Sequence, residues 1–495
     1  MGLSIEREQF SDDDVRRFAE RLRDDLAALA RLLARPGFGD GPATIGVEVE
    51  LSLIDGAARP LPANREVLAD AADPRLTIEL DRFNLECNSR PVALAGRPFE
   101  ALDADLADAL GGIAAAAERH GGRPILVGIL PTVQTRDLEP EMMTDSPRFR
   151  ALSAGIRRLR ERDFVLCIDG EDPLTMRCQD VTAEGAGTSL QLHLRVAPAA
   201  FAATHAAAQL ATAPALAVAG NAPLFLGHRL WEETRIALFK QAVDERGALP
   251  DAWRPPARVS FGNGWVRHGA HELFAESVAL HPPLLPVSGD EDVRAIMRAG
   301  GIPHLAELRL HHGTVWRWNR AIYDPDAGGH LRIELRALPS GPTRADMLAN
   351  AAFLLGLTLA LRDETSWMLP AFPFEYAHRN FYRAAQHGLD AMLLWPTRET
   401  PSPQPVRVAE LVARLIERAH GGLVAAGVDD AEAGRRLAIV AARVASGQTG
   451  ARWLRRQLAR LERGASRDEA LAAVVERYHA EASRERPVHE WSEAP

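Results

Sequence analysis

The stretch Ile45–Ser52, IGVEVELS, alternates apolar and polar residues, and three other stretches of the chain repeat this alternation. Successive side chains of a β-strand point to opposite faces, so Glu48 and Glu50 share one face, opposite three apolar side chains. We therefore expect strands that have one apolar face and one face rich in acids. The other three stretches are Thr77–Asn88 (TIELDRFNLECN), Ser189–Val196 (SLQLHLRV) and Leu331–Ala337 (LRIELRA).

The polar faces of the two later strands combine a histidine and an acid with arginines. A single strand of this kind is compatible with an antiparallel sheet that shows one polar face to water. Glutamate is depleted in strands, however, so acids that recur at a spacing of two need a reason. Four such strands together favour a metal or phosphate site. The polar positions are Gln191, His193 and Arg195 on one strand, and Arg332, Glu334 and Arg336 on the other.

Glu79 and Glu86 are separated by an odd number of residues, which places them on opposite faces of a straight strand. Both can face one site only if the chain turns or bulges between them. The intervening residues 81–84, Asp-Arg-Phe-Asn, suit such a break.

Composition indicates a globular protein and excludes several classes of partner. Of the 495 residues, 46% are hydrophobic and 25% charged, and the net charge of −9 does not indicate a nucleic-acid partner. We expect no membrane association, because no apolar run approaches the ~20 residues of a span. The acidic N-terminus lacks the apolar stretch of a signal peptide, and Cys87, Cys167 and Cys178 include no CxxC pair. We therefore expect a cytoplasmic protein.

Lysine is nearly absent, since Lys240 is the only one among 58 basic residues. Its setting, LFKQ, is not that of a P-loop or a kinase, so arginine and metal must handle any phosphate. The chain also lacks GxGxxG, HExxH and GxSxG, which argues against dinucleotide enzymes, common zinc proteases and α/β-hydrolases.

Three regions are expected along the chain: an N-terminal helix in residues 1–40, a catalytic domain in 41–396 and a C-terminal helical appendage in 397–495, entered through a linker at 397–405. Caps, turn residues and apolar periodicity predict the helices. We expect strands at 123–130, 164–168 and within 305–320, and loops at 169–187 and 247–264. The expected helices outside the C-terminal region are 11–35, 99–120, 147–163, 198–219, 229–243 and 343–362.

Acids, a histidine and arginines on one sheet suit ATP-dependent phosphoryl transfer. Mg²⁺ prefers oxygen ligands and is often held by carboxylates together with phosphate oxygens. Arginine offers planar donors for phosphate or carboxylate oxygens. Arg317 and Arg320 are candidates for a substrate carboxylate. Trp316 is either part of the packed core or a wall for the substrate or adenine.

Five motifs in this order resemble the glutamate–cysteine ligase type 2 or carboxylate–amine ligase family, within the glutamine synthetase-like superfamily. The resemblance covers roughly residues 40–390. The motifs are GVEVEL (46–51), IELDRFNLEC (78–87), LQLHLRV (190–196), GNAPLFLGHRLWEETR (220–235) and RIELRALPSGPT (332–343).

The resemblance implies an α+β fold, in which a curved antiparallel sheet forms a funnel with helices packed on its outer face. It implies ATP and Mg²⁺ as cofactors, with catalytic roles for Arg336, which stabilises the transferred phosphate, and for Glu334. We expect Asn221, Arg235 and Arg332 to contact substrate or nucleotide. The metal ligands implied are Glu48, Glu50, Glu79, Glu86, His193 and Glu334.

The expected activity is the ATP-dependent joining of a carboxylate, such as the γ-carboxyl of glutamate, to cysteine or another amine through an acyl phosphate. Two alternatives stay open, namely a guanidino kinase-like phosphotransferase and a non-catalytic binding protein on the same fold. The usual serines near Asn221 and Arg235 are replaced here, which bears on the substrate contacts of this pair. Small molecules are the expected partners, and the oligomeric state stays open.

Overall fold

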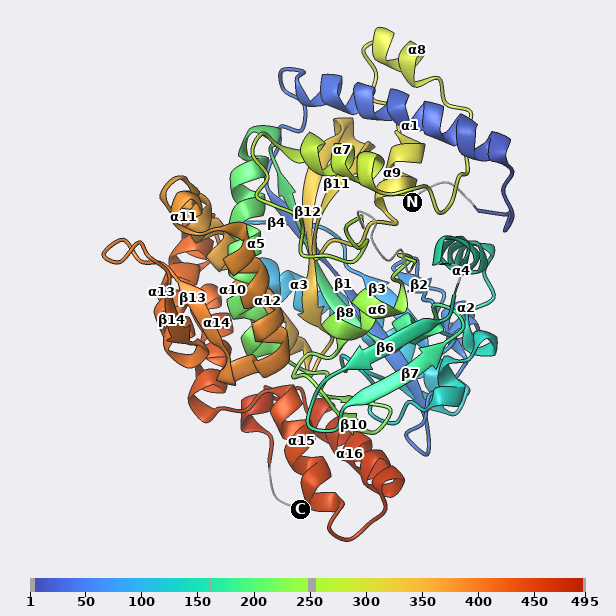
Figure 1. The fold of residues 1–495 in the computed structure, drawn as a ribbon. Coiled ribbons are helices and arrows are strands. Elements are labelled where there is room, and N and C mark those ends of the chain that lie inside the picture. The colour runs from blue at the N-terminus through green and yellow to red at the C-terminus, as the bar shows by residue number, and fades with distance from the viewer. Residues whose placement is uncertain (1–4, 161, 248–254, 493–495) are drawn as a thin grey trace.

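The computed structural model describes residues 5–160, 162–247 and 255–492. Its centre is an eight-stranded sheet with the order β11-β12-β8-β1-β3-β2, and all paired strands are antiparallel (Figure 1). Two short strands, β4 and β5, pair with opposite ends of the long strand β1. The strands are β1 (Thr44–Asp55), β2 (Leu76–Ile78), β3 (Asn84–Asn88), β4 (Val92–Ala93), β5 (Gly122–Ile125), β8 (Ser189–Val196), β11 (Asn319–Asp324) and β12 (His330–Pro339).

The sheet is curled, and helices cover its apolar face. Val49, Leu192 and Ile333 are buried there, since each lies on the apolar side of its strand. This confirms the predicted α+β fold with a curved antiparallel sheet and outer helices. The helices that contact the sheet strands or pack on one another behind them are α3 (Pro98–Arg119), α5 (Phe201–Ala219), α10 (Arg344–Arg362), α12 (Phe374–His387), α13 (Val408–Ala425) and α14 (Asp430–Ser446).

Smaller elements surround this centre. Three hairpins stand apart from the sheet: β6 (Phe164–Ile168) with β7 (Leu174–Cys178), β9 (Leu224–Phe225) with β10 (His228–Arg229), and β13 (Met392–Trp395) with β14 (Gln404–Arg407). The remaining α-helices are α1 (Asp12–Leu33), α2 (Asn64–Ala71), α4 (Pro147–Arg160), α6 (Arg235–Ala242), α7 (Ala270–Leu280), α8 (Val293–Arg298), α9 (Ala306–His312), α11 (Thr365–Ala371), α15 (Gly450–Leu461) and α16 (Arg467–Ala482). The 3-10 turns include η3 (Thr182–Ala186) and η7 (Val488–Glu490).

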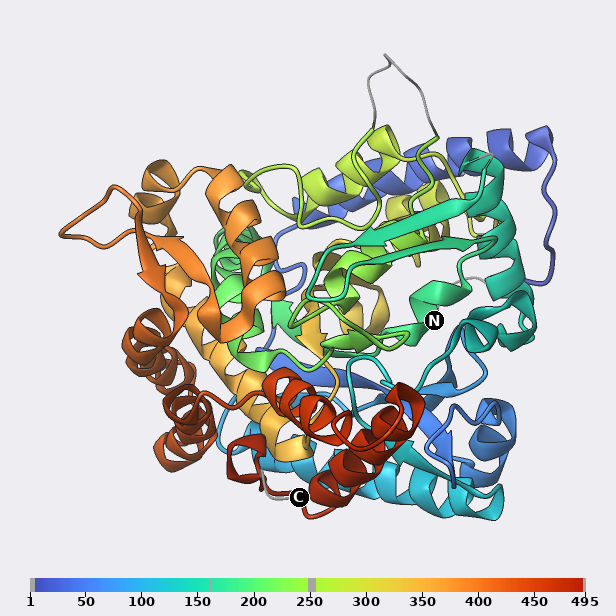
Figure 2. The same ribbon diagram turned by 60° about the horizontal axis from the view of Figure 1, so that its bottom comes forward.

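Several expected helices are confirmed, together with the side chains that begin them. Ser11 caps α1 through a reciprocal pair of hydrogen bonds with Asp14. Thr343 caps α10 by accepting a hydrogen bond from the backbone N–H of Asp346. The C-terminal region is mainly helical, as expected, and α15 and α16 lie across the end of the sheet (Figure 2).

The strand expected within 305–320 is wrong over most of this range. Residues Ala306–His312 form helix α9, and only Asn319–Asp324 form a strand. The reason is a tertiary contact, because the backbone N–H of Leu308 in the first turn donates to the carboxylate of Asp25 on α1 at 3.0 Å. An acid from a remote helix therefore caps α9, and the local alternation carries no sign of it.

Three other expectations are only partly met. The strand expected at 123–130 is regular only over Gly122–Ile125, and the helix expected at 229–243 begins at Arg235. Residues 397–403 form the loop of the β13–β14 hairpin. The described part of the loop expected at 247–264 has no helix or extended strand, and residues 248–254 lie outside the described residues.

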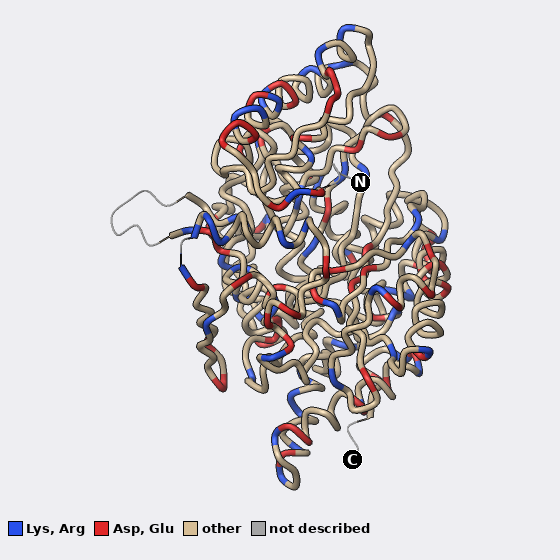
Figure 3. Tube along the Cα trace, turned by 90° about the vertical axis from the view of Figure 1, so that its right-hand side faces the viewer, with Lys and Arg blue, Asp and Glu red and all other residues tan. Residues whose placement is uncertain are grey.

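One helix among the described residues, α10, has the length and hydropathy of a membrane span, but 83% of that window is buried inside the protein. A core helix of a globular protein has the same properties. Basic and acidic residues are interspersed along the described chain (Figure 3).

Asp25 joins α1 to α9 in a buried position, with an exposed fraction of 1%. Burial raises the pKa of Asp25 to about 7, although the hydrogen bond from Leu308 lowers it in part. A carboxyl group with a raised pKa binds its proton more tightly in the folded state. Its contribution to stability is therefore present at low pH and is lost as the pH rises towards 7.

We predict that the wild type loses stability relative to the Asp25→Asn variant between pH 4.5 and pH 7. The slope expected is roughly 1.4 kcal/mol per pH unit, because one proton is bound only in the folded state. Thermal unfolding across this range measures it. Asp13→Asn, at an exposed position of the same helix, is the control, and a parallel pH dependence of wild type and Asp25→Asn would contradict the prediction.

Candidate active site

Strand register brings the acids of the polar faces together. Glu50 on β1 lies opposite Glu86 on β3, and Glu334 on β12 lies opposite His193 on β8. Directly opposed side chains of antiparallel strands lie about 5 Å apart. Residues separated by up to 286 positions therefore meet on one concave face.

The expected break between Glu79 and Glu86 is present. β2 ends at Ile78, the chain turns, and β3 begins at Asn84, whose backbone N–H donates to Asp81 at 2.9 Å. Thr77 lies opposite Glu86 in the resulting hairpin. This turn resolves the odd spacing, because Glu79 leaves the strand and approaches Glu86.

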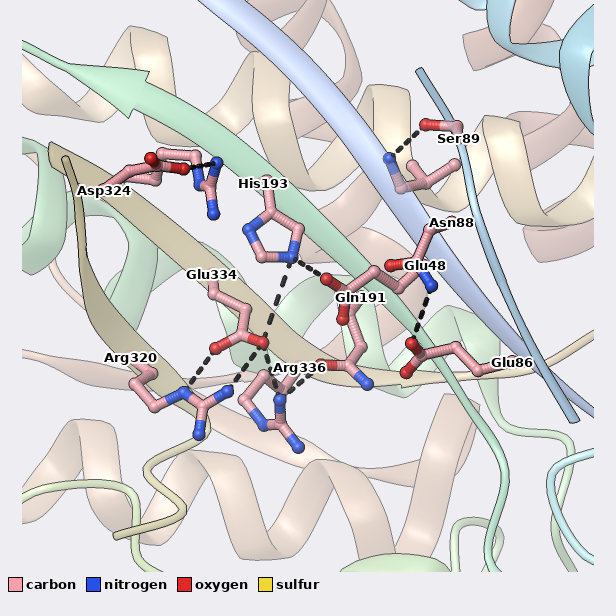
Figure 4. A network of polar contacts seen from close by, with 12 residues as sticks. Glu48, Glu86, Asn88, Ser89, Gln191, His193, Arg320, Asp324, Glu334 and Arg336 are labelled. Atoms are coloured by element: carbon pink, nitrogen blue, oxygen red, sulfur yellow. Dashed lines mark hydrogen bonds and ion pairs between the residues drawn. The ribbon is translucent and has the colours of Figure 1, made fainter. Parts of the chain in front are cut away.

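Two groups of three residues have ligand atoms within 4.8 Å of one another. The first group is Glu48, His193 and Glu334, and it is seen in Figure 4 beside Arg320 and Arg336. The second group is Glu50, Glu79 and Glu86. The six residues expected as metal ligands thus fall into two adjacent sets.

A cavity of about 440 Å³ is lined by the whole second group and by Glu48 of the first, whereas His193 and Glu334 lie outside its lining. Glu48, Glu50, Glu79 and Glu86 contribute to one wall, with Arg320 and Arg336 beside them. The remaining wall is largely apolar and includes side chains from α4, α6 and the segment before β11. Among these apolar residues are Phe149, Leu152, Phe239, Val243, Leu285 and Trp316.

Glu334 is fixed by two arginines. Arg320 binds both of its carboxylate oxygens, at 2.5 and 3.0 Å, and Arg336 binds one of them at 2.7 Å. Burial opposes ionisation of Glu334, but the positive charges of Arg320 and Arg336 outweigh it, so the pKa of Glu334 is lowered. The carboxylate therefore stays charged and orders both guanidinium groups.

Glu48 is paired with the histidine of the same group. The Nε2 atom of His193 lies 2.9 Å from Oε1 of Glu48. Burial raises the pKa of Glu48, but the charge of His193 and its hydrogen bond outweigh burial, and the pKa is lowered overall.

The second group has fewer compensating charges. Glu50 accepts hydrogen bonds from the backbone of Ser189 at 2.7 Å and from Gln191 at 2.8 Å. Burial and then the charges of Glu48 and Glu50 raise the pKa of Glu86 to about 8. Burial, followed by the charges of Glu86 and Glu50, raises the pKa of Glu79 well above its usual range. Three neighbouring carboxylates therefore compete with one another for ionisation.

Glu184 is a site residue that the sequence reasoning missed. It lies in η3, inside the segment expected to be a loop, and it lines the same cavity. Burial and then the charge of Glu50 raise the pKa of Glu184 to about 8. No strand alternation marks this position, so periodicity gave no signal for it. Gln191, which donates to Glu50, was on the polar face of the LQLHLRV strand and had such a signal.

The expected substrate contacts divide into two sets. Trp316 lines the cavity and also packs against Phe239, and its contact with substrate or adenine stays a prediction. Arg235 is buried behind the cavity, where its Nη2 donates to Ala337 at 2.6 Å and its Nε to Glu233 at 3.2 Å. It shares a small chamber of about 20 Å³ with Glu50, Glu184 and Arg336.

Three expected contacts lie outside the cavity lining. Arg317 is bound to Glu276 at 2.7 Å, and Arg332 is bound to Asp324 at 2.7 Å. Asn221 is fully buried and donates to Ser340 at 2.7 Å and to Tyr478 at 2.8 Å. Of the two arginines considered for a substrate carboxylate, the structure places Arg320 on the cavity wall and Arg317 away from it.

A match to a protein-family model covers residues 44–477, and that model is described as Glutamate-cysteine ligase family 2 (GCS2). The chain belongs to this family. Membership supports an ATP-dependent carboxylate–amine ligase as the general class of activity. A comparison with the sequences of curated proteins gave no match.

Solved structures similar to this family member include a glutamate–cysteine ligase from Francisella tularensis in complex with AMP. The two chains are 10% identical, with 90% of this chain and 89% of that chain covered and a TM-score of 0.52. A bifunctional glutathione synthetase from Pasteurella multocida is also 10% identical, with 93% of this chain and 53% of that chain covered and a TM-score of 0.49. At this identity the first likeness concerns the fold alone, which this chain shares with that glutamate–cysteine ligase.

We predict that Glu79→Gln raises the melting temperature of the protein in EDTA at pH 8, by roughly 2 °C or more. The substitution keeps the shape of the side chain and removes a carboxyl group that, at pH 8, either carries its charge beside Glu50 and Glu86 or holds a proton that the unfolded chain would release, and both states cost stability. Differential scanning fluorimetry measures the effect. Glu66→Gln, at an exposed position of α2, should leave the melting temperature unchanged, and a lower value for Glu79→Gln would contradict the repulsion.

Proposed function

We propose that the protein is an ATP- and Mg²⁺-dependent ligase that joins a carboxylate, the γ-carboxyl of glutamate in the first instance, to an amine through an acyl phosphate. The observation that carries this proposal is a cavity lined by Glu48, by the second ligand group and by Arg320 and Arg336. Both arginines bind Glu334. Family membership supports the general class, and the site chemistry supports the finer assignment.

The residues present fit divalent cations. The two groups contain five glutamates and one histidine, which is an oxygen-rich donor set suited to Mg²⁺. Burial and the charges of neighbouring carboxylates raise the pKa of Glu86 and of Glu79, which supports a bound cation as the partner of this group. We propose Glu50, Glu79 and Glu86 as one ligand set and Glu48, His193 and Glu334 as the other. Bound there, Mg²⁺ neutralises charge on the β- and γ-phosphates of the nucleotide.

The arginines supply the remaining positive charge. In the first step the substrate carboxylate oxygen attacks the γ-phosphorus of ATP, and the bond to the ADP oxygen breaks. Arg336, held by Glu334 and Gln191, and Arg320, held by Glu334 and the carbonyl of Gly313, present fixed donors to the transferred group. Because these donors are already oriented, they need little reorganisation when charge moves.

In the second step the amine nitrogen attacks the acyl carbon, inorganic phosphate leaves, and the nitrogen loses a proton. Water is a competing nucleophile, so the intermediate has to be protected from it. The apolar wall, which includes Phe149, Leu152 and Leu285, limits the room for water beside the reacting carbon. We propose that this wall, together with Trp316, contacts the nucleobase or the amine substrate.

Phosphate release from ATP and Mg²⁺ tests the proposal, with glutamate present and with or without a panel of amines that includes cysteine. We expect release only when both the acid and an amine are present. A phosphorylated product without any amine indicates the kinase-like alternative. Absence of ATP binding indicates a non-catalytic binding protein.

We further propose the cytoplasm as the location of this protein and residues 41–396 as the segment that carries the reacting groups.

Replacing Arg336 by lysine should lower kcat by about 10²-fold or more, because lysine keeps the charge but cannot reproduce the fork that binds Glu334 and an oxyanion together. Steady-state kinetics with saturating ATP measures it. Arg157→Lys, at an exposed position of α4, provides the control. An unchanged kcat in Arg336→Lys would remove Arg336 from the transfer step.

A further inference from the structure

A line of hydrogen bonds connects the C-terminal helices to Glu50. The hydroxyl of Tyr478 on α16 accepts a hydrogen bond from the Asn221 side chain at 2.8 Å. The same Asn221 amide group donates to the carbonyl of Ser340 at 2.7 Å. The Ser340 hydroxyl in turn donates to the backbone carbonyl of Glu50 at 2.6 Å. Tyr478, Asn221 and Ser340 have exposed fractions of 1% or less, so water does not offer an alternative partner.

Asn221 lies at the centre of this arrangement and is closely packed by the residues around it. Its backbone N–H donates to Glu233 at 3.1 Å, and Glu233 binds Arg235 behind the cavity. Gly450, the first residue of α15, packs so closely on the Asn221 side chain that a Cβ atom has no room there. The next backbone N–H, of Ala451, donates to the carbonyl of Gly220 at 2.9 Å. Both C-terminal helices therefore hold the 220–221 turn.

Tyr478 also holds the segment that follows β5. Its hydroxyl donates to the carbonyl of Leu126 at 2.7 Å, just after β5, which pairs with β1. A single phenol group thus joins the strand neighbouring β1, the 220–221 turn and, through Asn221, the end of β12. Figure 2 shows α15 and α16 at this end of the sheet.

We propose that Tyr478 is a positioning residue for the active site, and that through Asn221 and Ser340 the C-terminal helices set the position of Glu50. The inference deepens the proposed function, because it rests on Glu50 as a ligand of a divalent cation. Partners that orient metal ligands from behind typically change metal affinity or activity by about 10–100-fold when they are removed. Tyr478 does not line the cavity, so its effect on the site is indirect.

Tyr478→Phe tests this directly, because it removes one oxygen and keeps the ring that packs against Trp453 and Trp491. Tyr323→Phe is the matched control. Tyr323 is also buried, and its hydroxyl also donates to a backbone carbonyl, that of Pro303, at 2.7 Å. We expect both variants to lower the melting temperature by similar amounts. Only Tyr478→Phe should weaken Mn²⁺ binding, measured by electron paramagnetic resonance, by about 10-fold or more.

Ser340→Ala cuts the same line next to Glu50 and leaves the C-terminal helices untouched. It should weaken Mn²⁺ binding as Tyr478→Phe does, and the double variant should lose no more than either single one, because residues of one network are not additive. This variant also decides the question if Tyr478→Phe does not fold.

The rate of hydrogen exchange in peptides from β1 is a second measurement, and it needs no metal. Faster exchange around Glu50 in Tyr478→Phe, but not in Tyr323→Phe, supports positioning. Wild-type Mn²⁺ affinity and wild-type exchange in Tyr478→Phe would overturn the inference. If the wild type itself binds no Mn²⁺, the proposed function fails, and exchange at β1 still decides the role of Tyr478.

Discussion

The register between β1, β3, β8 and β12 is the constraint on which the site depends. It sets Glu50 against Glu86 and His193 against Glu334 on one concave face. Side chains of a strand alternate with a period of two, so a slip of one residue would send the acids of β1 into the helical layer and bring its apolar side chains into the cavity. Packing of Val49, Leu192 and Ile333 against the outer helices opposes such a slip. The core beneath the sheet therefore fixes the positions of the acids, although Val49, Leu192 and Ile333 do not themselves line the cavity.

The buried glutamates also need positive charge near them, and the arginines supply it to the first ligand group more than to the second. Glu334 has two guanidinium partners, whereas Glu79 has only the hydrogen bond from the backbone N–H of Leu80, at 3.3 Å, in the described structure. Buried charges without partners are costly, so this half of the site is the part that the proposed cations would stabilise. The near absence of lysine fits this chemistry, because the planar fork of arginine can bind a carboxylate and still offer donors to a phosphate.

Much of this site could be predicted from sequence because its residues lie on strands. Alternation placed Glu48, Glu50, His193 and Glu334 on polar faces, and the odd spacing of Glu79 and Glu86 required the turn that the structure contains. Glu184 could not be found in this way, because it lies in a 3-10 turn without periodicity. Helix α9 was hidden for a related reason, since its capping acid, Asp25, lies 283 residues earlier in the chain. The positions of Arg317 and Arg332 could not be predicted either, because they depend on ion pairs with Glu276 and Asp324 that only the folded chain defines.

The contact between Asn221 and Tyr478 spans 257 residues. During synthesis the strands that carry Glu48, Glu50 and Glu86 leave the ribosome well before α16 does. N-terminal segments generally fold first as a chain is made. The acidic face therefore lacks its contact with Tyr478 until α16 has been translated. A chain terminated before α16 would retain every acid of the site but lack Tyr478, which we propose positions Glu50, so premature termination is expected to give an inactive product rather than a smaller enzyme.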